Sequence, residues 1–385
     1  MYLTQTMRFI FICSGLEPGR DGVGDYIRRL AGELSRREHT VGAVAINDAV
    51  VDARCEEKQA TESAPLVALR FPRSLPRHER IAQAARWIGE FKPDWVSLQF
   101  VCFGLQTKGL VSGWTPLFNK LCHTYRVHWM FHELWVGGPQ WHNKLLGRLQ
   151  KRGILAMYRT LEPVVTHTSN EPYARMLRRC GIQAEILPLH GNIPIATESD
   201  WRSQLNQALG ISDDQRAGWL ILGIFGTIQI ELRTSDWFAR VLDWAVANSR
   251  RVALLGIGRI TSPGNILWAK LINQYADQAS FYHFGEQPPA HISQYLSFID
   301  YGIATGFASI SGKSGTIAAM LEHGKEVLVP CWDLPADSDS PARGSFVHRR
   351  FGIRSLVRDS EIKFGVEDVA HQLTMALEAA KKSIS

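Results

Sequence analysis

Two glycine-rich segments of this sequence contain residue types and spacings that could do chemistry. The first, GLEPGRDGVG (15–24), lies between an apolar run and a helical pattern, and its four glycines let the backbone approach a ligand closely. The glycines are not spaced as GxGxxG, the pattern of dinucleotide-binding folds, so NAD and FAD are disfavoured. The alternative interpretation is a flexible turn, with Asp25 as the N-cap of the helix that follows.

The second segment, SGKSGT (311–316), lies at a predicted junction between a strand and a helix. Free backbone N–H groups and the helix dipole attract phosphate at such a junction, and a lysine adds positive charge. The segment is not a Walker A loop, because GxxxxGK requires glycine at 307 and the chain has Phe307. We expect diphosphate binding here, with an ordinary helix cap as the alternative. The residues concerned are Ser311, Gly312, Lys313, Ser314, Gly315 and Thr316.

A histidine and two aspartates are further candidates. His132 and Glu133 follow the strand pattern RVHWMF, and a histidine at the end of a strand can bond a substrate hydroxyl or act as a base. A purely structural histidine is the more common case for a single residue. Asp337 and Asp339 form a metal-binding type of DxD triplet, but it lies in a polar segment, so we interpret it as a solvated loop and expect no metal.

Alternating strand and helix patterns are predicted to position these segments. RFIFIC (8–13) predicts a strand, and apolar residues at helical spacing predict a helix over 25–39. The polar stretch 47–64 is interpreted as a loop. A second round of alternation opens with WLILGIFGT (219–227), and a last helix is predicted over 366–383.

Two such rounds predict an α/β protein with two doubly wound, Rossmann-like domains whose parallel sheets are covered on both faces. Ligands of open α/β sheets bind beyond the carboxyl ends of the strands. We therefore expect the domains to face a cleft that is lined by the loops 14–24, 99–108, 132–143, 226–233, 256–263 and 306–316.

Length and charge limit the number of domains and the kinds of partner that this protein can have. The 385 residues are 45% hydrophobic and 21% charged, which suits two or three ordinary domains. Residues 1–195 carry 25 basic against 17 acidic residues, a net charge of +8, whereas residues 196–385 carry 18 against 20. The basic half suits an anionic substrate or an anionic membrane surface. No nucleic-acid-binding motif is present, so we expect no nucleic-acid partner.

The sequence also predicts a location. The longest apolar runs, 9–13 and 219–225, are far below the roughly 18 residues that span a bilayer, and no secretory signal is expected. Six cysteines without a CxxC pair indicate a reducing cytosol. The basic helical pattern at 144–161 is compatible with binding at the inner membrane surface, a solvated basic face being the alternative.

Seven segments occur along the sequence in a characteristic order. They are GLEPGRDGVGDYIRRLAGEL, FHELWVG, HTSNEPYARMLRRCGI, LPLHGNIPI, FGTIQIEL, LLGIGR and ISGKSGTIAAMLEHGKEVLV. This ordered set resembles the family 4-like glycosyltransferases of the GT-B fold. The resemblance implies transfer of a sugar from a nucleotide-diphosphate sugar to an acceptor hydroxyl, with retention and without metal or cofactor. It implies an acceptor-binding domain at 1–195, a linker at 196–217, a nucleotide-sugar-binding domain at 218–365, and a helix at 366–385 that packs back on the first domain.

The resemblance also implies roles for single residues. His132 corresponds to the first-domain histidine that approaches the donor sugar. The implied donor contacts outside 311–316 are Gly22 and Gly24 near the diphosphate, Gly226 and Thr227 at the opening of the second domain, and Gly256 and Gly258 in the turn beside the nucleotide. The acceptor side is the least specified, and its candidates are Glu17, Asp25 and Glu133.

The chain departs from the family pattern at two places. The usual pair of glutamates is absent, with Ser311 and Ala319 at those positions, and the basic pair after the first strand of the second domain is incomplete. Lys313 is a candidate for the missing charge. Two other functions therefore stay open: a catalytically silent sugar-nucleotide-binding protein, and a GT-B nucleotide-sugar epimerase or hydrolase. Inversion also stays open, because His132 could serve as a base.

Overall fold

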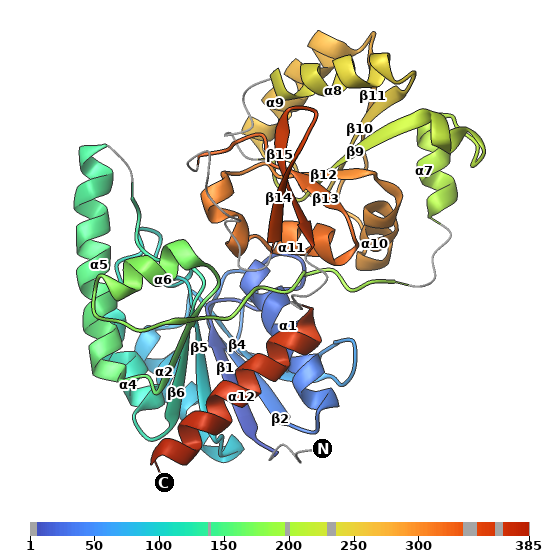
Figure 1. Cartoon of the computed structure of the whole chain (residues 1–385). Coiled ribbons are helices and arrows are strands. Elements are labelled where there is room, and N and C mark those ends of the chain that lie inside the picture. Colours follow the sequence, from blue (N-terminus) through green and yellow to red (C-terminus); the bar gives the residue numbers. More distant parts are fainter. Residues whose placement is uncertain are drawn as a thin grey trace. The chain divides into compact units, whose positions relative to one another are not determined.

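The computed structural model describes residues 6–137, 140–196, 201–228, 236–333, 345–358 and 365–384 (Figure 1). The chain divides into two compact units. Unit 1 comprises Met1–Pro188 and Val366–Ser385, and unit 2 comprises Leu189–Gly365.

Unit 1 is built on a sheet of eight described strands in the order β3-β4-β2-β1-β5-β6-β7-β8. All neighbouring strands are parallel except β3 and β4. The strands are β1 (Arg8–Cys13), β2 (Thr40–Asp48), β3 (Cys55–Gln59), β4 (Leu66–Pro72), β5 (Trp95–Phe100), β6 (Arg126–Phe131), β7 (Val165–Thr168) and β8 (Glu185–Ile186).

Helices cover both faces of this sheet. The described helices are α1 (Gly22–Arg36), α2 (Arg77–Phe91), α3 (Cys102–Leu105), α4 (Thr115–Cys122), α5 (Trp141–Leu161), α6 (Glu171–Arg178) and α12 (Val366–Ile384), with a 3₁₀ turn η1 (Ser112–Trp114). One apolar core lies between the sheet and α2, α4 and α5. Helix α12 packs against α1 (Figure 1). It also contacts β7, so the predicted return of the terminal helix to the first unit is confirmed.

Unit 2 contains a second sheet of seven described strands in the order β11-β10-β9-β12-β13-β15-β14. The strands are β9 (Trp219–Phe225), β10 (Arg251–Ile257), β11 (Ala279–His283), β12 (Tyr301–Ile303), β13 (Glu326–Leu328), β14 (Ser345–Arg350) and β15 (Ile353–Arg358). Its described helices are α7 (Arg202–Leu209), α8 (Asp236–Ala247), α9 (Ser262–Tyr275), α10 (Pro289–Phe298) and α11 (Gly315–Glu322), with 3₁₀ turns η2 (Gln215–Gly218) and η3 (Ala308–Lys313).

The α/β class is as predicted, but the sheets are mixed rather than parallel. Strand β3 lies inside the stretch 47–64, which was interpreted as a loop. The sequence did not predict this strand because its inward-facing residues Glu57 and Gln59 are polar, so the alternation of apolar residues is missing. The antiparallel hairpin of β14 and β15 was also not predicted. The segment expected as a linker contributes Trp201 and Leu205 to a core of unit 2. None of the described helices is both long enough and apolar enough to cross a membrane.

Candidate functional site

The glycine segment of unit 1 ends in a capped helix. Asp21 is the N-cap of α1, and its Oδ1 accepts hydrogen bonds from the backbone N–H groups of Val23, at 2.9 Å, and Gly24, at 3.0 Å. The interpretation of Asp25 as the N-cap is therefore wrong, and Gly22 and Gly24 lie in the first helical turn. Since a carboxylate already occupies the N–H of Gly24, a phosphate at this end of α1 would have to displace it. Donor contact by the two glycines stays a prediction.

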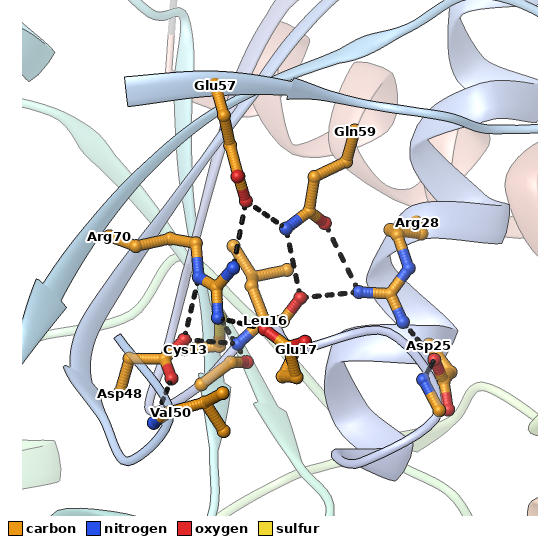
Figure 2. A network of polar contacts seen from close by, with 12 residues as sticks. Cys13, Leu16, Glu17, Asp25, Arg28, Asp48, Val50, Glu57, Gln59 and Arg70 are labelled. Atoms are coloured by element: carbon orange, nitrogen blue, oxygen red, sulfur yellow. Dashed lines mark hydrogen bonds and ion pairs between the residues drawn. The ribbon is translucent and has the colours of Figure 1, made fainter. Parts of the chain in front are cut away.

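A buried arginine anchors the loop before α1 (Figure 2). Arg70 on β4 donates to Asp48 at 2.9 Å, to Glu57 at 2.9 Å and to Glu17 at 2.5 Å. The Asp48 Oδ2 also accepts from the backbone N–H of Leu16 at 3.0 Å. Burial alone would raise the pKa of Asp48, but the bonds from Arg70 and from backbone N–H groups lower it. Glu17 is thus engaged in an ion pair that fixes the loop.

A second arginine completes this anchor. Arg28 on α1 donates to the backbone carbonyl of Leu16 at 2.7 Å and pairs with Asp25 (Figure 2). Gln59 donates to the same Leu16 carbonyl at 3.0 Å, and the Asp25 Oδ1 accepts from the N–H of Gly19 at 3.0 Å. The loop is therefore held by contacts from β4 and from α1. Glu17 and Asp25, two of the three predicted acceptor-side residues, take part in these contacts.

His132 directly follows β6 and is 6% exposed. Its Nε2 lies 2.8 Å from the Oε1 of Gln99, and its ring meets the Tyr26 ring edge to face at 5.1 Å. Burial lowers the pKa of His132 to about 3, so the imidazole is neutral at pH 7. A neutral imidazole at the end of a strand can accept a proton or a hydrogen bond from a hydroxyl. Glu133 is half-buried beside it.

In unit 2, the structure brings three of the predicted residues together. Gly226 has φ +84° and Gly258 has φ +108°, both in the left-handed region. A Cβ on Gly226 would lie 2.9 Å from the Thr316 Cγ2, and one on Gly258 would lie 3.0 Å from the Gly226 Cα. We call Gly226, Gly258 and Thr316 the turn cluster. It joins the carboxyl ends of β9 and β10 to the start of α11.

The other predicted residues near β9 and β10 differ in position. The Thr227 carbonyl accepts a bond from Thr305 Oγ1 at 2.9 Å. Gly256 lies inside β10, where a Cβ would come within 2.5 Å of the His283 Cδ2, so it allows close packing rather than forming a turn. Residues 229–235 and the Asp337–Asp339 triplet lie outside the described residues.

The SGKSGT segment is not a direct junction between strand and helix, because η3 separates them. Ser314 is the N-cap of α11 and accepts from the Ile317 N–H at 3.3 Å, and its Oγ lies 2.9 Å from that of Thr316. Ser311 is buried and donates to the Ala308 carbonyl at 2.8 Å. The serine hydroxyls thus shape the segment, while Lys313 is half-buried at the end of η3. Gly312 and Gly315 lie on either side of this end.

A cavity of about 320 Å³ in unit 2 was not indicated by any motif. Its lining includes Arg240, Arg349 and Arg354 together with Trp237 and Trp332, and the Arg354 guanidinium lies 4.6 Å from the centroid of the Trp332 ring. Positive charge beside indole rings suits an anionic or sugar-like ligand. The arginines come from α8 and from the β14–β15 hairpin, so only folding brings them together.

Comparisons with known proteins bear on the fold. No known family profile matches the sequence, and no curated protein sequence matches it significantly. Among solved structures, HepE from Anabaena in complex with UDP and glucose is 12% identical, with TM-score 0.56 over 98% of this chain and 91% of that chain. A UDP-GlcNAc 2-epimerase from Neisseria meningitidis bound to UDP-GlcNAc is 11% identical, with TM-score 0.51 over 98% and 93%.

A third similar structure is an α,α-trehalose-phosphate synthase from Burkholderia xenovorans in complex with glucose-6-phosphate. It is 11% identical, with TM-score 0.50 over 84% of this chain and 85% of that chain. At these identities the likeness establishes the fold and nothing finer. The chain therefore has the GT-B fold of two Rossmann-like domains, as the sequence predicted.

Proposed function

We propose that this protein is a glycosyltransferase that moves a sugar from a nucleotide-diphosphate sugar to an acceptor hydroxyl. The observation that supports this most is the turn cluster, which places two left-handed glycines and the start of α11 at one edge of the second sheet. Ligands of open α/β sheets bind at that edge. Two of the similar solved structures hold UDP and glucose, or UDP-GlcNAc, and we extend that ligand class to this chain.

The diphosphate is proposed to bind between Gly226–Thr227 and the segment 311–316. The first N–H groups of α11 and the positive end of its dipole face negative charge favourably. Lys313 adds a full charge at the same end of the helix. These groups would stabilise the leaving diphosphate as its charge develops, so the proposed transfer requires no metal and no cofactor.

The proposed role of His132 is to contact the transferring sugar. It lies at a strand end in unit 1 and is held by Gln99 through Nε2, which leaves Nδ1 as the nitrogen available to a ligand. Retention without a protein nucleophile suits the lack of a glutamate at positions 311 and 319. If His132 acts instead as a base toward the acceptor hydroxyl, the transfer inverts.

Nucleotide-sugar epimerisation or hydrolysis is the second candidate. A UDP-GlcNAc 2-epimerase is among the structures that share this fold, and Ser311 and Ala319 occupy the positions of the family glutamates. The same substitutions would also suit a silent binding protein. The three functions differ in whether UDP-sugar is consumed and in whether an acceptor is needed.

We also propose that unit 1 binds peripherally to an anionic membrane surface through α5. Its side chains Trp141, Leu145 and Leu149 are 76%, 51% and 51% exposed at four-residue spacing. Lys144, Arg148 and Arg152 are exposed on the same helix. Apolar and basic side chains on one helix bind the interface of an anionic bilayer. A cytoplasmic enzyme with a membrane-associated acceptor would use such a surface.

The experiment that tests the function is a screen of nucleotide-sugars by thermal shift, followed by turnover with and without added acceptors. A ligand at 100 times its dissociation constant should stabilise the protein by about 2.7 kcal/mol. Release of UDP that depends on an acceptor supports transfer. Free sugar released without an acceptor supports hydrolysis, and an epimer supports epimerisation, which are the two forms of the second candidate.

The role of His132 is tested by His132→Ala, with the exposed His78→Ala of the same unit as the control. A sugar contact made in the transition state should cost about 10²–10⁴-fold in turnover if proton transfer is involved. His78→Ala should leave turnover unchanged. A His132→Ala protein that is less stable but fully active would remove His132 from the site.

A further inference from the structure

His132 is one end of a continuous chain of buried polar side chains. Its Nε2 lies 2.8 Å from Gln99 Oε1, and Gln99 Nε2 donates to Ser97 Oγ at 2.7 Å. Ser97 Oγ lies 2.7 Å from His128 Nδ1, and His128 Nε2 lies 3.0 Å from His167 Nδ1. We call these five residues the polar chain.

The strands place the polar chain on one face of the first sheet. Ser97 and Gln99 alternate along β5, and Ser97 is in register with His128 on β6. His167 lies on β7, the next strand, and His132 follows β6. Residues two apart on a strand share a face, and residues in register on neighbouring strands lie side by side. The sheet therefore fixes the order of the contacts.

Burial makes this chain costly unless every group is bonded. Ser97 and His128 are 0% exposed, and Gln99 and His167 are each 3% exposed. A buried polar group without a partner lowers the free energy of unfolding by about 1–3 kcal/mol. Apolar side chains on this face of the sheet would carry no such cost. Burial and the two neighbouring histidines also lower the pKa of His128 well below its usual value, so it too is neutral.

The contacts at Gln99 fix the direction of the first two bonds. Gln99 presents its oxygen to His132, so His132 Nε2 must be the donor. The Gln99 amide in turn uses Ser97 Oγ as acceptor, and the Ser97 hydroxyl has a proton to donate to His128 Nδ1. With that proton given to Nδ1, His128 carries its own proton on Nε2 and donates to His167 Nδ1. Turning the Gln99 amide would make His132 Nε2 an acceptor, so the tautomer of His132 depends on the bond between Gln99 and Ser97.

We propose that Gln99, Ser97, His128 and His167 are positioning residues that hold His132 as the Nε2–H tautomer, with Nδ1 as a hydrogen-bond acceptor for the substrate. The role in substrate binding rests on the proposed function, whereas the tautomer itself does not. The chain positions and does not conduct protons, because a proton could pass Gln99 only through a disfavoured form of its amide. Within the described residues His132 Nδ1 has no hydrogen-bond partner, so it is available to a hydroxyl.

The test is nitrogen NMR of the full-length protein labelled with ¹⁵N-histidine, with His132→Ala used to assign the His132 signals. We expect Nε2 of His132 to be protonated and Nδ1 unprotonated at pH 7.5. Ser97→Ala should leave Gln99 without its fixed acceptor, so that its amide can turn and the His132 signals shift toward a mixture of tautomers. Ser97→Thr keeps the hydroxyl and should restore the single tautomer.

Thr168→Val is the matched control. Thr168 is 0% exposed on β7 and donates to the Phe131 carbonyl at 3.1 Å. This variant therefore removes a buried hydroxyl that does not belong to the polar chain. It should leave the His132 tautomer unchanged. A parent protein with the proton on Nδ1, or a Ser97→Ala protein with an unaltered tautomer, would overturn the proposal. The parent measurement alone decides the direction of the chain if Ser97→Ala does not fold.

Turnover gives the second readout. If His132 contacts the sugar chiefly in the transition state, an equal mixture of tautomers halves the fraction of complexes that can react. Looser orientation adds to this, so kcat of Ser97→Ala should fall about two- to tenfold. KM should change little, and Ser97→Thr should recover kcat. If the tautomer behaves as expected but no sugar turns over in the parent, the proposed function fails while the positioning of His132 stands. An unchanged kcat in a Ser97→Ala protein with mixed tautomers would remove the chain from catalysis.

Discussion

Gly226 packs directly against Thr316, so closely that a Cβ at position 226 would lie 2.9 Å from the Thr316 Cγ2. The two residues belong to elements far apart in the sequence, the end of β9 and the first turn of α11. Their contact brings a left-handed turn and a helix N-terminus to one place. The proposed diphosphate site depends on this contact.

Gly226→Ala should therefore disturb both folding and donor binding. The added Cβ meets Thr316, and an L-residue at φ +84° is strained, together about 1–3 kcal/mol of the free energy of unfolding. Urea unfolding and UDP titration measure the two effects. Gly218→Ala, where a Cβ would meet nothing within 4 Å, is the control. Equal stability of the two variants would contradict the role of Gly226.

Lys313→Ala should weaken the binding of UDP much more than that of uridine. The lysine is proposed to interact with the diphosphate, and a charged hydrogen bond contributes about 1.5–3 kcal/mol, or about ten- to a hundredfold in affinity. Calorimetric titration of both ligands gives the comparison. Lys270→Ala removes the same charge from an exposed position on α9 and should bind UDP as the parent does. Unchanged affinity of Lys313→Ala for UDP and GDP would exclude this site.

Leu145→Ser should weaken binding to vesicles that contain phosphatidylglycerol. The side chain is 51% exposed on α5 between basic residues, and its loss removes apolar area from the bilayer contact, so several-fold weaker binding is expected. Co-sedimentation with vesicles at low and at high salt measures the effect. Val246→Ser, on α8 and 78% exposed, is the matched control. The proposal for α5 is wrong if the parent protein does not sediment with anionic vesicles at low salt.

Stability should fall as the pH falls below about 6.5, where a histidine in the unfolded chain begins to bind protons. Burial lowers the pKa of His132 to about 3 and that of His167 to about 4, so the folded protein leaves both uncharged over this range. The unfolded state then binds more protons, and each histidine reduces the free energy of unfolding by up to about 1.4 kcal/mol per pH unit between pH 6.5 and its folded pKa. Above pH 7 these groups should contribute no pH dependence.

Urea unfolding at pH 5.0, 5.5, 6.0 and 7.5 checks this slope. His167→Gln removes one of the titrating groups and should reduce the slope by up to one proton, while other groups affect both proteins alike. An identical slope in parent and variant would show that His167 is not held neutral in the folded state.

Turnover should persist after treatment with EDTA. The proposed leaving-group stabilisation uses α11 and Lys313, and the Asp337–Asp339 triplet is interpreted as a solvated loop. Dialysis against EDTA followed by a UDP-release assay, with and without Mg²⁺ or Mn²⁺, measures the requirement. Loss of activity that either metal restores would return Asp337 and Asp339 to the candidate site.

Some features of this protein follow from local sequence alone. The apolar run 8–13 and the helical spacing of Ile27, Leu30 and Leu34 predicted β1 and most of α1, because burial of one face sets the period of each element. The same signal predicted α12 within a residue of its observed end. Repeated alternation of such elements was enough to predict two Rossmann-like domains.

Local signals failed where a polar side chain bonds to a partner that the local pattern does not indicate. Glu57 and Gln59 make β3 look like a loop, yet they face inward because Arg70 and Arg28 lie opposite them. The start of α1 was placed three residues late because Asp21 and Asp25 are both plausible caps, and only the bonds to Val23 and Gly24 distinguish them. In each case the hydrogen-bond partner is either distant in the sequence or identified only by the conformation of the backbone.

The polar chain behind His132 is the clearest case of what only the tertiary structure decided. The sequence indicated His132 as a candidate because it ends a strand pattern. No motif in the sequence connects it with Ser97, His128 or His167. Strand register brings these side chains onto one face of the sheet. Burial then requires each of them to find a hydrogen-bond partner. The amide oxygen of Gln99 makes His132 Nε2 the donor.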